Sequence, residues 1–240
     1  MQKPAAIIFD VDGTIADSER YGHLPACNEA FRILGLPLQW EWPEFRQLLE
    51  QMQGNANRLR HVLRGMGYGA ADTEAYVEAF IPIKKELYIN KYVHKTRLRP
   101  GVEAVIATLV EAGIRLAIVS TSHEKQIHQL LATKLPAYKD VFHPVLGKES
   151  GQKTGEEGML YEKCLDMLGL PAADCLVFED SAAGFKAARK AGIPTIVVTN
   201  DYTAHEDFTG ALQVAASWAE VDVAGILAGK FQPQQISTEK

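Results

Sequence analysis

Two aspartates and a threonine directly after a short apolar stretch are the first candidates for chemistry. Asp10, Asp12 and Thr14 follow the apolar residues 5–9. Two carboxylates this close repel each other unless a positive charge lies between them, and Mg²⁺ is a cation that prefers such oxygen ligands. Gly13 lets the chain leave by a tight turn. The same residues also fit an ordinary Asp-Gly turn after a buried strand.

Two later apolar stretches end in polar side chains in the same way. Residues 116–119 lead into Ser120, Thr121 and Ser122, and residues 175–178 lead into Glu179, Asp180 and Ser181. Hydroxyls and free backbone N–H groups at a helix start can hold an anion, although serine and aspartate are also common helix N-caps. In open α/β sheets ligands bind at the carboxyl ends of the strands. We therefore expect Asp10, Ser120 and Asp180 to share one edge of a sheet.

Alternating strands and helices are expected to position these residues. The pattern predicts strands over 5–9, 115–119, 141–146, 175–178 and 195–198, and helices over 102–112, 123–135, 159–168 and 182–191. This order is typical of a parallel sheet with helices on both faces. We therefore predict an α/β fold with a Rossmann-like core.

A helical stretch over residues 20–95 interrupts this alternation just after the first strand. Its apolar residues recur at helical spacing, and Arg99-Pro100-Gly101 marks the return to alternation. Pro82 is expected to kink or split the last of its helices. The pattern predicts an all-helical cap domain over 17–96, inserted into a core of 1–16 and 97–240. An insert at this point could form a lid over the strand ends.

The sequence Asp-Val-Asp-Gly-Thr at residues 10–14 resembles the first motif of the haloacid dehalogenase-like (HAD) phosphohydrolases. The resemblance implies that Asp10 is a nucleophile and that Asp12 is its general acid and base. It also implies a helical cap and a Mg²⁺ cofactor. The metal ligands would be Asp10, Asp12 and Asp180, with Glu179 as an alternative ligand or a residue behind the ligands.

The second and third motifs of this family also have counterparts in the chain. The resemblance makes Ser120 the residue that binds the transferring phosphoryl group, with Thr121 and Ser122 helping to hold it. It makes Lys153 the cation that offsets the repulsion between a carboxylate and a phosphate. The family usually shows Lys-Pro-x-Pro-Asp, whereas both prolines are missing after Lys153. Lys148 is a nearby rival, and a solvated loop lysine is the simpler alternative.

Three further stretches resemble the CbbY-like sugar-phosphate phosphatases within this family. They are residues 12–19, which end in Glu19 and have His23 beyond them, Trp40-Glu41-Trp42, and residues 201–208. The resemblance implies that Glu19 and His23 contact a sugar phosphate, together with Gly54 and Arg58 of a cap segment whose expected lysine is absent. Lys84 could supply a charge for a distal phosphate. Packing, capping or solvated positions would also explain these residues, and the tryptophans suit packing between helices.

Composition restricts the partners and the compartment. The net charge of −5 argues against nucleic acid or an anionic membrane as the main partner. Cys27, Cys164 and Cys175 are an odd number without a C-x-x-C pair, which suits a reducing compartment. We expect no secretory signal and no membrane span. These observations predict a cytoplasmic protein, either a monomer or a weak homodimer.

The resemblance of these motifs to the family implies a Mg²⁺-dependent phosphatase acting through an aspartyl-phosphate. Its substrate would be a small sugar phosphate, for example a pentulose bisphosphate such as xylulose 1,5-bisphosphate. A phosphomutase of the β-phosphoglucomutase type shares the core and cap, and the motifs do not separate it from a phosphatase. A phospho-accepting signalling module is a further alternative, but it does not account for the helical insertion.

Overall fold

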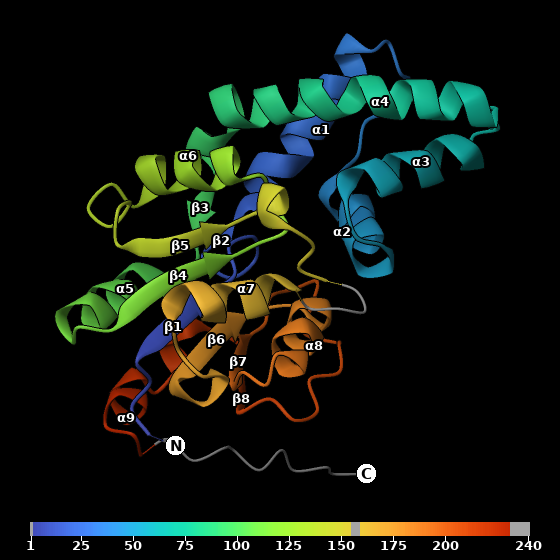
Figure 1. The fold of residues 1–240 in the computed structure, drawn as a ribbon. Coiled ribbons are helices and arrows are strands. Elements are labelled where there is room, and N and C mark those ends of the chain that lie inside the picture. Colours follow the sequence, from blue (N-terminus) through green and yellow to red (C-terminus); the bar gives the residue numbers. More distant parts are fainter. Residues whose placement is uncertain (1, 155–158, 231–240) are drawn as a thin grey trace. The chain divides into compact units, whose positions relative to one another are not determined.

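The computed structural model describes residues 2–154 and 159–230 (Figure 1). The described chain divides into two compact units. The first unit comprises the residues up to Ala16 and those from Leu98 onward, and the second comprises Asp17–Arg97. Two-residue strands, β2 (Ala16–Asp17) and β3 (Arg97–Leu98), lie where the chain passes from one unit to the other. Each unit is described separately below.

Six strands of the first unit form one parallel sheet in the order β5-β4-β1-β6-β7-β8. They are β1 (Ala6–Phe9), β4 (Arg115–Val119), β5 (Phe142–Leu146), β6 (Cys175–Glu179), β7 (Thr195–Val198) and β8 (Gln213–Ala215). All residues of the central strand β1 are buried, as a continuous apolar run predicts. The predicted α/β fold is confirmed, with β8 as a strand that the apolar pattern did not indicate.

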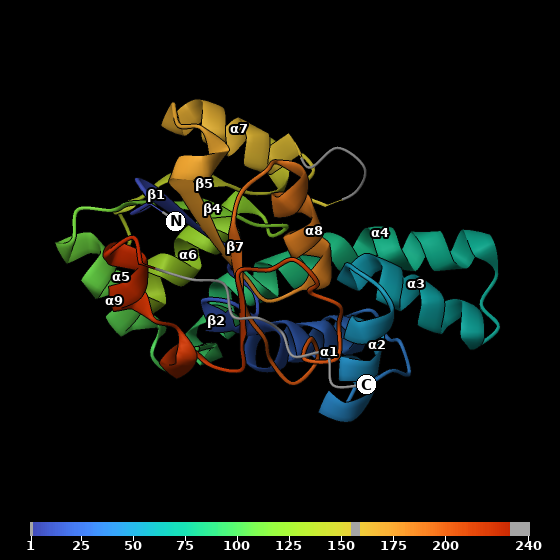
Figure 2. The ribbon, with the colours of Figure 1, turned by 90° about the horizontal axis from the view of Figure 1, so that it is seen from below.

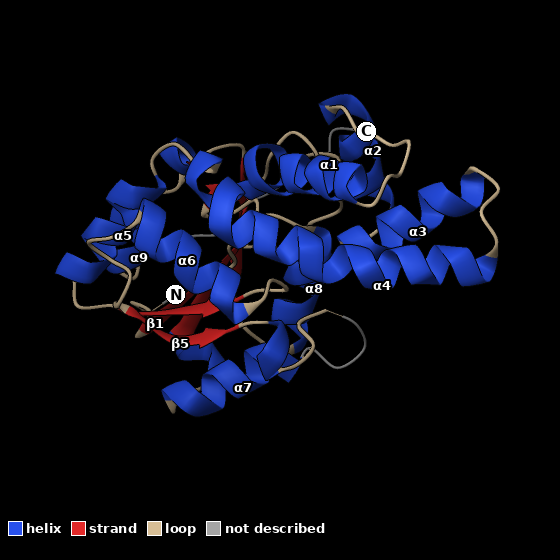
Figure 3. Cartoon of the chain, turned by 90° about the horizontal axis from the view of Figure 1, so that it is seen from above, coloured by secondary structure: helices blue, strands red, loops and turns tan. Residues whose placement is uncertain are grey.

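Helices cover both faces of this sheet (Figures 2 and 3). They are α5 (Val102–Glu111), α6 (Glu124–Lys134), α7 (Met159–Leu168), α8 (Ala182–Lys190) and α9 (Val223–Leu227). Helices α7 and α8 pack on the face to which Ile8 points. Phe9 points to the opposite face and contacts the rings of Phe142 and Trp218. Figure 3 shows α5, α6 and α9 on one side of the sheet and α7 on the other. The end of β1, from which Asp10 follows, is therefore packed on both faces of the sheet.

Register brings the candidate residues to one edge of the sheet. Phe9, at the end of β1, pairs with Ile118 of β4 and with Phe178 of β6. Asp10, Ser120 and Asp180 therefore leave the sheet at nearly the same level. Because all these strands are parallel, this edge is the one at which ligands bind in such folds.

The second unit is helical. It contains a π-helix over Glu19–His23, α1 (Leu24–Ile33), α2 (Trp42–Gln51), α3 (Asn55–Gly65), α4 (Ala70–Leu87), a π-helix over Tyr88–Tyr92 and a 3₁₀ turn over Val93–Lys95. Trp40 is buried and packs edge-on against Phe31 with ring centroids 4.7 Å apart. Of the two outcomes expected at Pro82, a kink or a split, the split does not occur, because α4 continues through Pro82 as one helix. None of the described helices is long and apolar enough to cross a membrane.

Candidate active site

Asp10 lies at the end of β1 and is only 6% exposed. The loop after it turns at Gly13, whose φ of +95° favours glycine. A Cβ on Gly13 would also lie 2.2 Å from an oxygen of Asp180, so a side chain here would displace that carboxylate. Trp218 donates a hydrogen bond from its indole N–H to the Thr14 carbonyl at 3.1 Å. The loop is therefore closely fixed next to Asp180.

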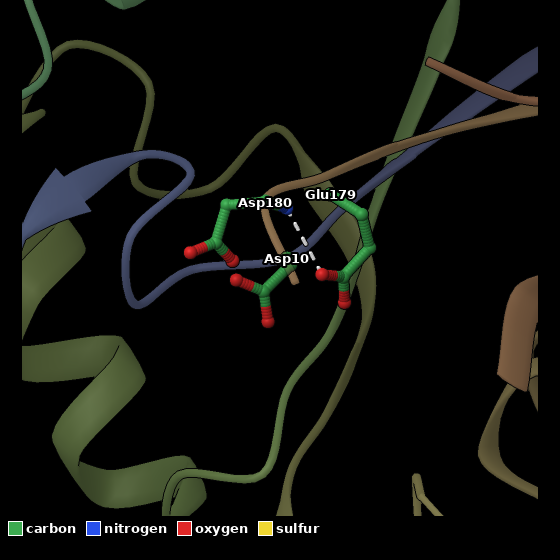
Figure 4. Close-up of side chains that lie close together, drawn as sticks. All are labelled: Asp10, Glu179 and Asp180. Carbon is green, nitrogen blue, oxygen red and sulfur yellow. Dashed lines mark hydrogen bonds between the residues drawn. The ribbon is translucent and has the colours of Figure 1, made fainter. Parts of the chain in front are cut away.

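Asp10, Glu179 and Asp180 form a buried acidic cluster, with one oxygen from each lying within 4.8 Å of the others (Figure 4). Burial raises the pKa of Asp10 to about 7, against the opposing effect of the Lys153 charge. Burial and the charges of Asp10 and Glu179 also raise the pKa of Asp180 well above its usual range. Oδ2 of Asp10 is buried without a hydrogen-bond partner among the described residues. Such an oxygen-rich, partly unsatisfied cluster fits a hard divalent cation such as Mg²⁺.

Lys153 is the cation that the structure places beside Asp10. Its Nζ lies 2.5 Å from Oδ1 of Asp10 and 2.5 Å from Oε1 of Glu179, and the side chain is buried. Burial acts to lower the pKa of Lys153, but the two acidic charges outweigh it and raise that pKa well above its usual range. The rival Lys148 lies exposed in a 3₁₀ turn over Lys148–Ser150. The loop continues into residues 155–158, which lie outside the described residues.

Glu179 is held by several donors at once. Its Oε2 accepts hydrogen bonds from the backbone N–H groups of Asp180 and Ser181, at 3.0 and 3.1 Å, and its Oε1 accepts one from the Tyr161 hydroxyl at 3.3 Å. A Cβ on Gly184 would lie 1.9 Å from Oε1, so the absent side chain makes room for this carboxylate. This environment suits either of the two roles expected for Glu179, which are a metal ligand and a residue behind the metal ligands.

Of the three hydroxyl residues after β4, one is buried, one is half-buried and one is exposed. Ser120 is fully buried, and its Oγ accepts a hydrogen bond from the Ser122 N–H at 3.1 Å. Ser122 donates from its Oγ to Oδ2 of Asp12 at 2.5 Å. Thr121 is exposed. Thus Ser122 contacts the candidate acid and base directly, while Ser120 supports the same turn.

Three residues around the cluster were not predicted. Asn200 donates from its amide to Oδ2 of Asp180 at 2.7 Å, and Tyr161 contacts Glu179. Arg99 donates to the Gly13 carbonyl and, at 2.7 Å, to the Thr199 carbonyl. Asn200 follows an apolar strand, so the strand-end rule could have identified it. Tyr161 and Arg99 carry no such signal, because their partners are distant in sequence.

The expected substrate residues of the helical unit lie largely in its interior. Nδ1 of His23 lies 2.8 Å from Nζ of Lys84, and both side chains are buried. The His23 ring stacks on Tyr88, with ring centroids 4.3 Å apart. Oε2 of Glu19 is buried without a hydrogen-bond partner among the described residues. Burial raises the pKa of Cys27 to about 12, with Lys84, Glu19 and Arg58 acting on it as neighbouring charges. These charged residues therefore gather around Cys27.

Arg58 also makes hydrogen bonds at the C-terminal end of α2. Its guanidinium donates to the Met52 carbonyl at 3.1 Å and to the Asn55 side chain at 2.9 Å. Met52 follows the last residue of α2, where backbone carbonyls lack helical partners. Gly54 has a φ of +83° and immediately precedes α3. The structure thus gives both residues a local structural role in the α2–α3 connection.

Comparison with known proteins identifies the family. The family model for haloacid dehalogenase-like hydrolases matches residues 4–192. The plasmid-encoded CbbY of Cupriavidus necator is 38% identical over 216 residues, covering 87% of this chain and 84% of that protein. The crystal structure of CbbY from Rhodobacter sphaeroides in complex with phosphate gives a TM-score of 0.77 at 30% identity, covering 93% of this chain and 99% of that chain. A mutant of that protein in complex with xylulose-(1,5)bisphosphate gives 0.76 at the same identity and coverage.

The matched residues include the strand ends after β1, β4 and β6 and the loop that carries Lys153. The agreement thus extends over the whole acidic edge of the sheet. On the family match and the 38% identity to a relative over most of both chains, this protein belongs to the haloacid dehalogenase-like hydrolases.

Proposed function

We propose that this hydrolase is a Mg²⁺-dependent phosphatase that cleaves a small sugar phosphate through an aspartyl-phosphate on Asp10. The observation that carries the proposal is the buried Asp10 carboxylate, with one oxygen bound to Lys153 and the other without a partner among the described residues. A carboxylate fixed in this way presents a free lone pair for attack on phosphorus.

Asp12 is the proposed general acid and base. Asp10 forms a bond to phosphorus while the bond from phosphorus to the sugar oxygen breaks, and Asp12 gives that oxygen a proton. In the second half, Asp12 takes a proton from the water that attacks the aspartyl-phosphate. The hydrogen bond from Ser122 holds the Asp12 carboxylate in one orientation for both transfers.

Charge neutralisation is the main electrostatic demand of this reaction. Asp10, Asp180 and the backbone carbonyl of Asp12 are the proposed holders of Mg²⁺, which supplies charge neutralisation at the phosphoryl oxygens. Lys153 adds a fixed positive charge from the protein side. Ser120 and the start of the following loop are the proposed binders of the phosphoryl oxygens, with Thr121 as a weaker contributor because it is exposed.

A sugar bisphosphate is the proposed substrate class. The mutant CbbY of Rhodobacter sphaeroides was crystallised with xylulose-(1,5)bisphosphate, and this chain places Glu19, His23 and Lys84 near one another in its helical unit. Two nitrogen groups and a carboxylate suit the hydroxyls and the distal phosphate of such a sugar. Gly54 and Arg58 are proposed to shape this region, Arg58 through its contacts with the α2–α3 connection.

Phosphate release tests the proposal directly. Purified protein with Mg²⁺ would be assayed against a panel of sugar mono- and bisphosphates, with Asp10→Asn as the control. We expect turnover with a preference for a pentulose bisphosphate, and none in the Asn variant despite an intact fold. Turnover by Asp10→Asn would refute the nucleophile. Exchange of phosphate between sugar positions without release would replace the phosphatase by a phosphomutase.

A further inference from the structure

The loop after β7 contacts the residues that follow β6 at two separate points. At its start, the Asn200 amide donates to Oδ2 of Asp180 at 2.7 Å. Further along, Oε2 of Glu206 accepts a hydrogen bond from the N–H of Ala182, the first residue of α8, at 2.6 Å. The proposed catalytic steps use neither Asn200 nor Glu206. The loop is therefore hydrogen-bonded both to the carboxylate of Asp180 and to the helix that follows it.

The orientation of the Asn200 amide is set by its own loop. Its Oδ1 accepts hydrogen bonds from the Tyr202 N–H and from the Thr203 hydroxyl, each at 3.1 Å. The Asn200 N–H in turn donates to the Thr203 hydroxyl oxygen at 3.1 Å. Because two donors already face the amide oxygen, the NH₂ group is the end that faces Asp180. Asn200 thus presents a donor, and not an acceptor, to the acidic cluster.

Packing and a charged side chain hold the same loop in place. Phe208 lies against Phe185 of α8, with ring centroids 6.1 Å apart, and both rings are buried. Arg99 binds the Thr199 carbonyl just before Asn200 and also binds the Gly13 carbonyl. The loop is consequently tied to α8 and to the turn that follows Asp10.

The two oxygens of Asp180 differ in their surroundings. Oδ2 receives the short amide hydrogen bond, whereas in the part of the chain that the structure describes Oδ1 has one long contact, of 3.4 Å from the Thr14 hydroxyl. Figure 4 shows the Asp180 carboxylate facing that of Asp10. Two facing carboxylates repel each other, so without a donor on one side Asp180 would turn away. The amide thus opposes this rotation and leaves Oδ1 available.

We propose that Asn200 is a positioning residue that holds Asp180 in the orientation in which it binds Mg²⁺, and that the loop over 199–208 fixes Asn200 for this task. The inference rests on the Mg²⁺ site of the proposed function. It assigns a role to the stretch 201–208, which the sequence singles out but the catalytic steps leave unused. Removal of a hydrogen-bond partner of a metal-binding carboxylate commonly lowers the metal affinity about 10- to 100-fold.

Binding of Mg²⁺ alone, measured by isothermal titration calorimetry, tests this role. We expect Asn200→Ala to raise the Kd for Mg²⁺ about 10- to 100-fold, and Thr203→Val, which removes the support of the amide, to raise it less. The control is Asn90→Ala, because Asn90 also donates an amide hydrogen bond to a carboxylate, that of Glu86 at 3.0 Å, but at an exposed position of the helical unit. That control should leave the Kd unchanged.

Kinetics separate positioning from a purely structural role. In Asn200→Ala, the Mg²⁺ concentration for half-maximal activity should rise, while kcat at saturating Mg²⁺ returns toward the wild-type value. A wild-type Kd for Mg²⁺ in a folded Asn200→Ala variant would overturn the proposal. If that variant does not fold, Thr203→Val decides in the same way. A wild-type protein that binds Mg²⁺ but releases no phosphate would refute the proposed function and leave this test intact.

Discussion

The acidic edge of the sheet and the charged interior of the helical unit use similar residues in different ways. At the sheet edge, the charged side chains are fixed by ion pairs and hydrogen bonds around the acidic cluster, as Lys153 is by Asp10 and Glu179. In the helical unit, the charges gather around Cys27. There, Arg58 binds a carbonyl at the end of α2. Preorganised charge is what chemistry on a phosphate needs, whereas recognition of a sugar tolerates groups that also serve the local fold.

This difference predicts how mutations should act in the two regions. Changes at the sheet edge should lower kcat, because they alter the charge that faces the reacting phosphate. Changes in the helical unit should alter KM or stability, because they remove proposed contacts to remote parts of a substrate or contacts within the fold. The predictions below test that division, from the largest expected effect to the smallest.

Lys153→Ala should lower kcat by about 10²- to 10³-fold, because removal of one preorganised electrostatic group from an active site typically costs this much. The measurement is steady-state phosphate release at saturating Mg²⁺. Lys148→Ala is the matched control, since Lys148 lies exposed in the same loop. Equal losses in the two variants would contradict the placement of Lys153 as the working cation.

Metal-free stability should depend on pH through Asp10, whose folded pKa of about 7 lies above its ordinary value of 3.8. Below 3.8 the carboxyl is protonated in both states and contributes nothing. As pH rises toward 7, the unfolded state loses its proton first, so Asp10 increasingly destabilises the fold. Above 7 that cost is complete, on the order of a few kcal/mol.

Urea unfolding in EDTA between pH 5 and pH 8 measures this cost. Asp10→Asn should be more stable than the wild type at pH 8, and this advantage should shrink toward pH 5. Added Mg²⁺ should stabilise the wild type more at pH 8 than at pH 6, because the cation no longer competes with a proton. A constant advantage across this range would exclude Asp10 as the titrating group.

Lys84→Met should raise the KM for a sugar bisphosphate about 10-fold and change kcat little, because the proposed contact of Lys84 is to a remote part of the substrate. Lys85→Met is the control, since Lys85 is the adjacent lysine and is less buried. A monophosphate substrate should show a smaller change in KM. A loss confined to kcat would instead give Lys84 a role in the chemical step.

The sheet edge could be predicted because one rule covers it. Apolar runs that end in Asp10, Ser120 and Asp180 indicate parallel strands, and parallel strands bring their carboxyl ends together. The same rule applies to Asn200 after β7, but a single amide carries less chemical meaning than a pair of acids. Tyr161 could not be predicted, because its hydrogen bond to Glu179 depends on how α7 packs on the sheet.

The helical unit offered no comparable rule. Helical periodicity indicates which residues are apolar and buried, but not which polar side chains a helix turns inward. Lys84 and His23 are buried as a contacting pair. The resemblance to a family singled out His23, and Lys84 was suggested because the lysine expected from that resemblance is absent. Pro82 shows the reverse case, because a strong local signal to break α4 did not prevent a continuous helix.

Arg58→Met should destabilise the fold by about 1–3 kcal/mol, because it removes charged hydrogen bonds to the Met52 carbonyl and the Asn55 side chain. The comparison of the two regions predicts that kcat per folded molecule stays within about 3-fold, since the substitution leaves the charge at the sheet edge unchanged. Thermal unfolding and phosphate release on the same preparation measure both effects, with the exposed Arg46→Met in α2 as the control for loss of a surface arginine. A large rise in KM for the bisphosphate without loss of stability would show that Arg58 binds substrate, and the helical unit would then hold preorganised charge as the sheet edge does.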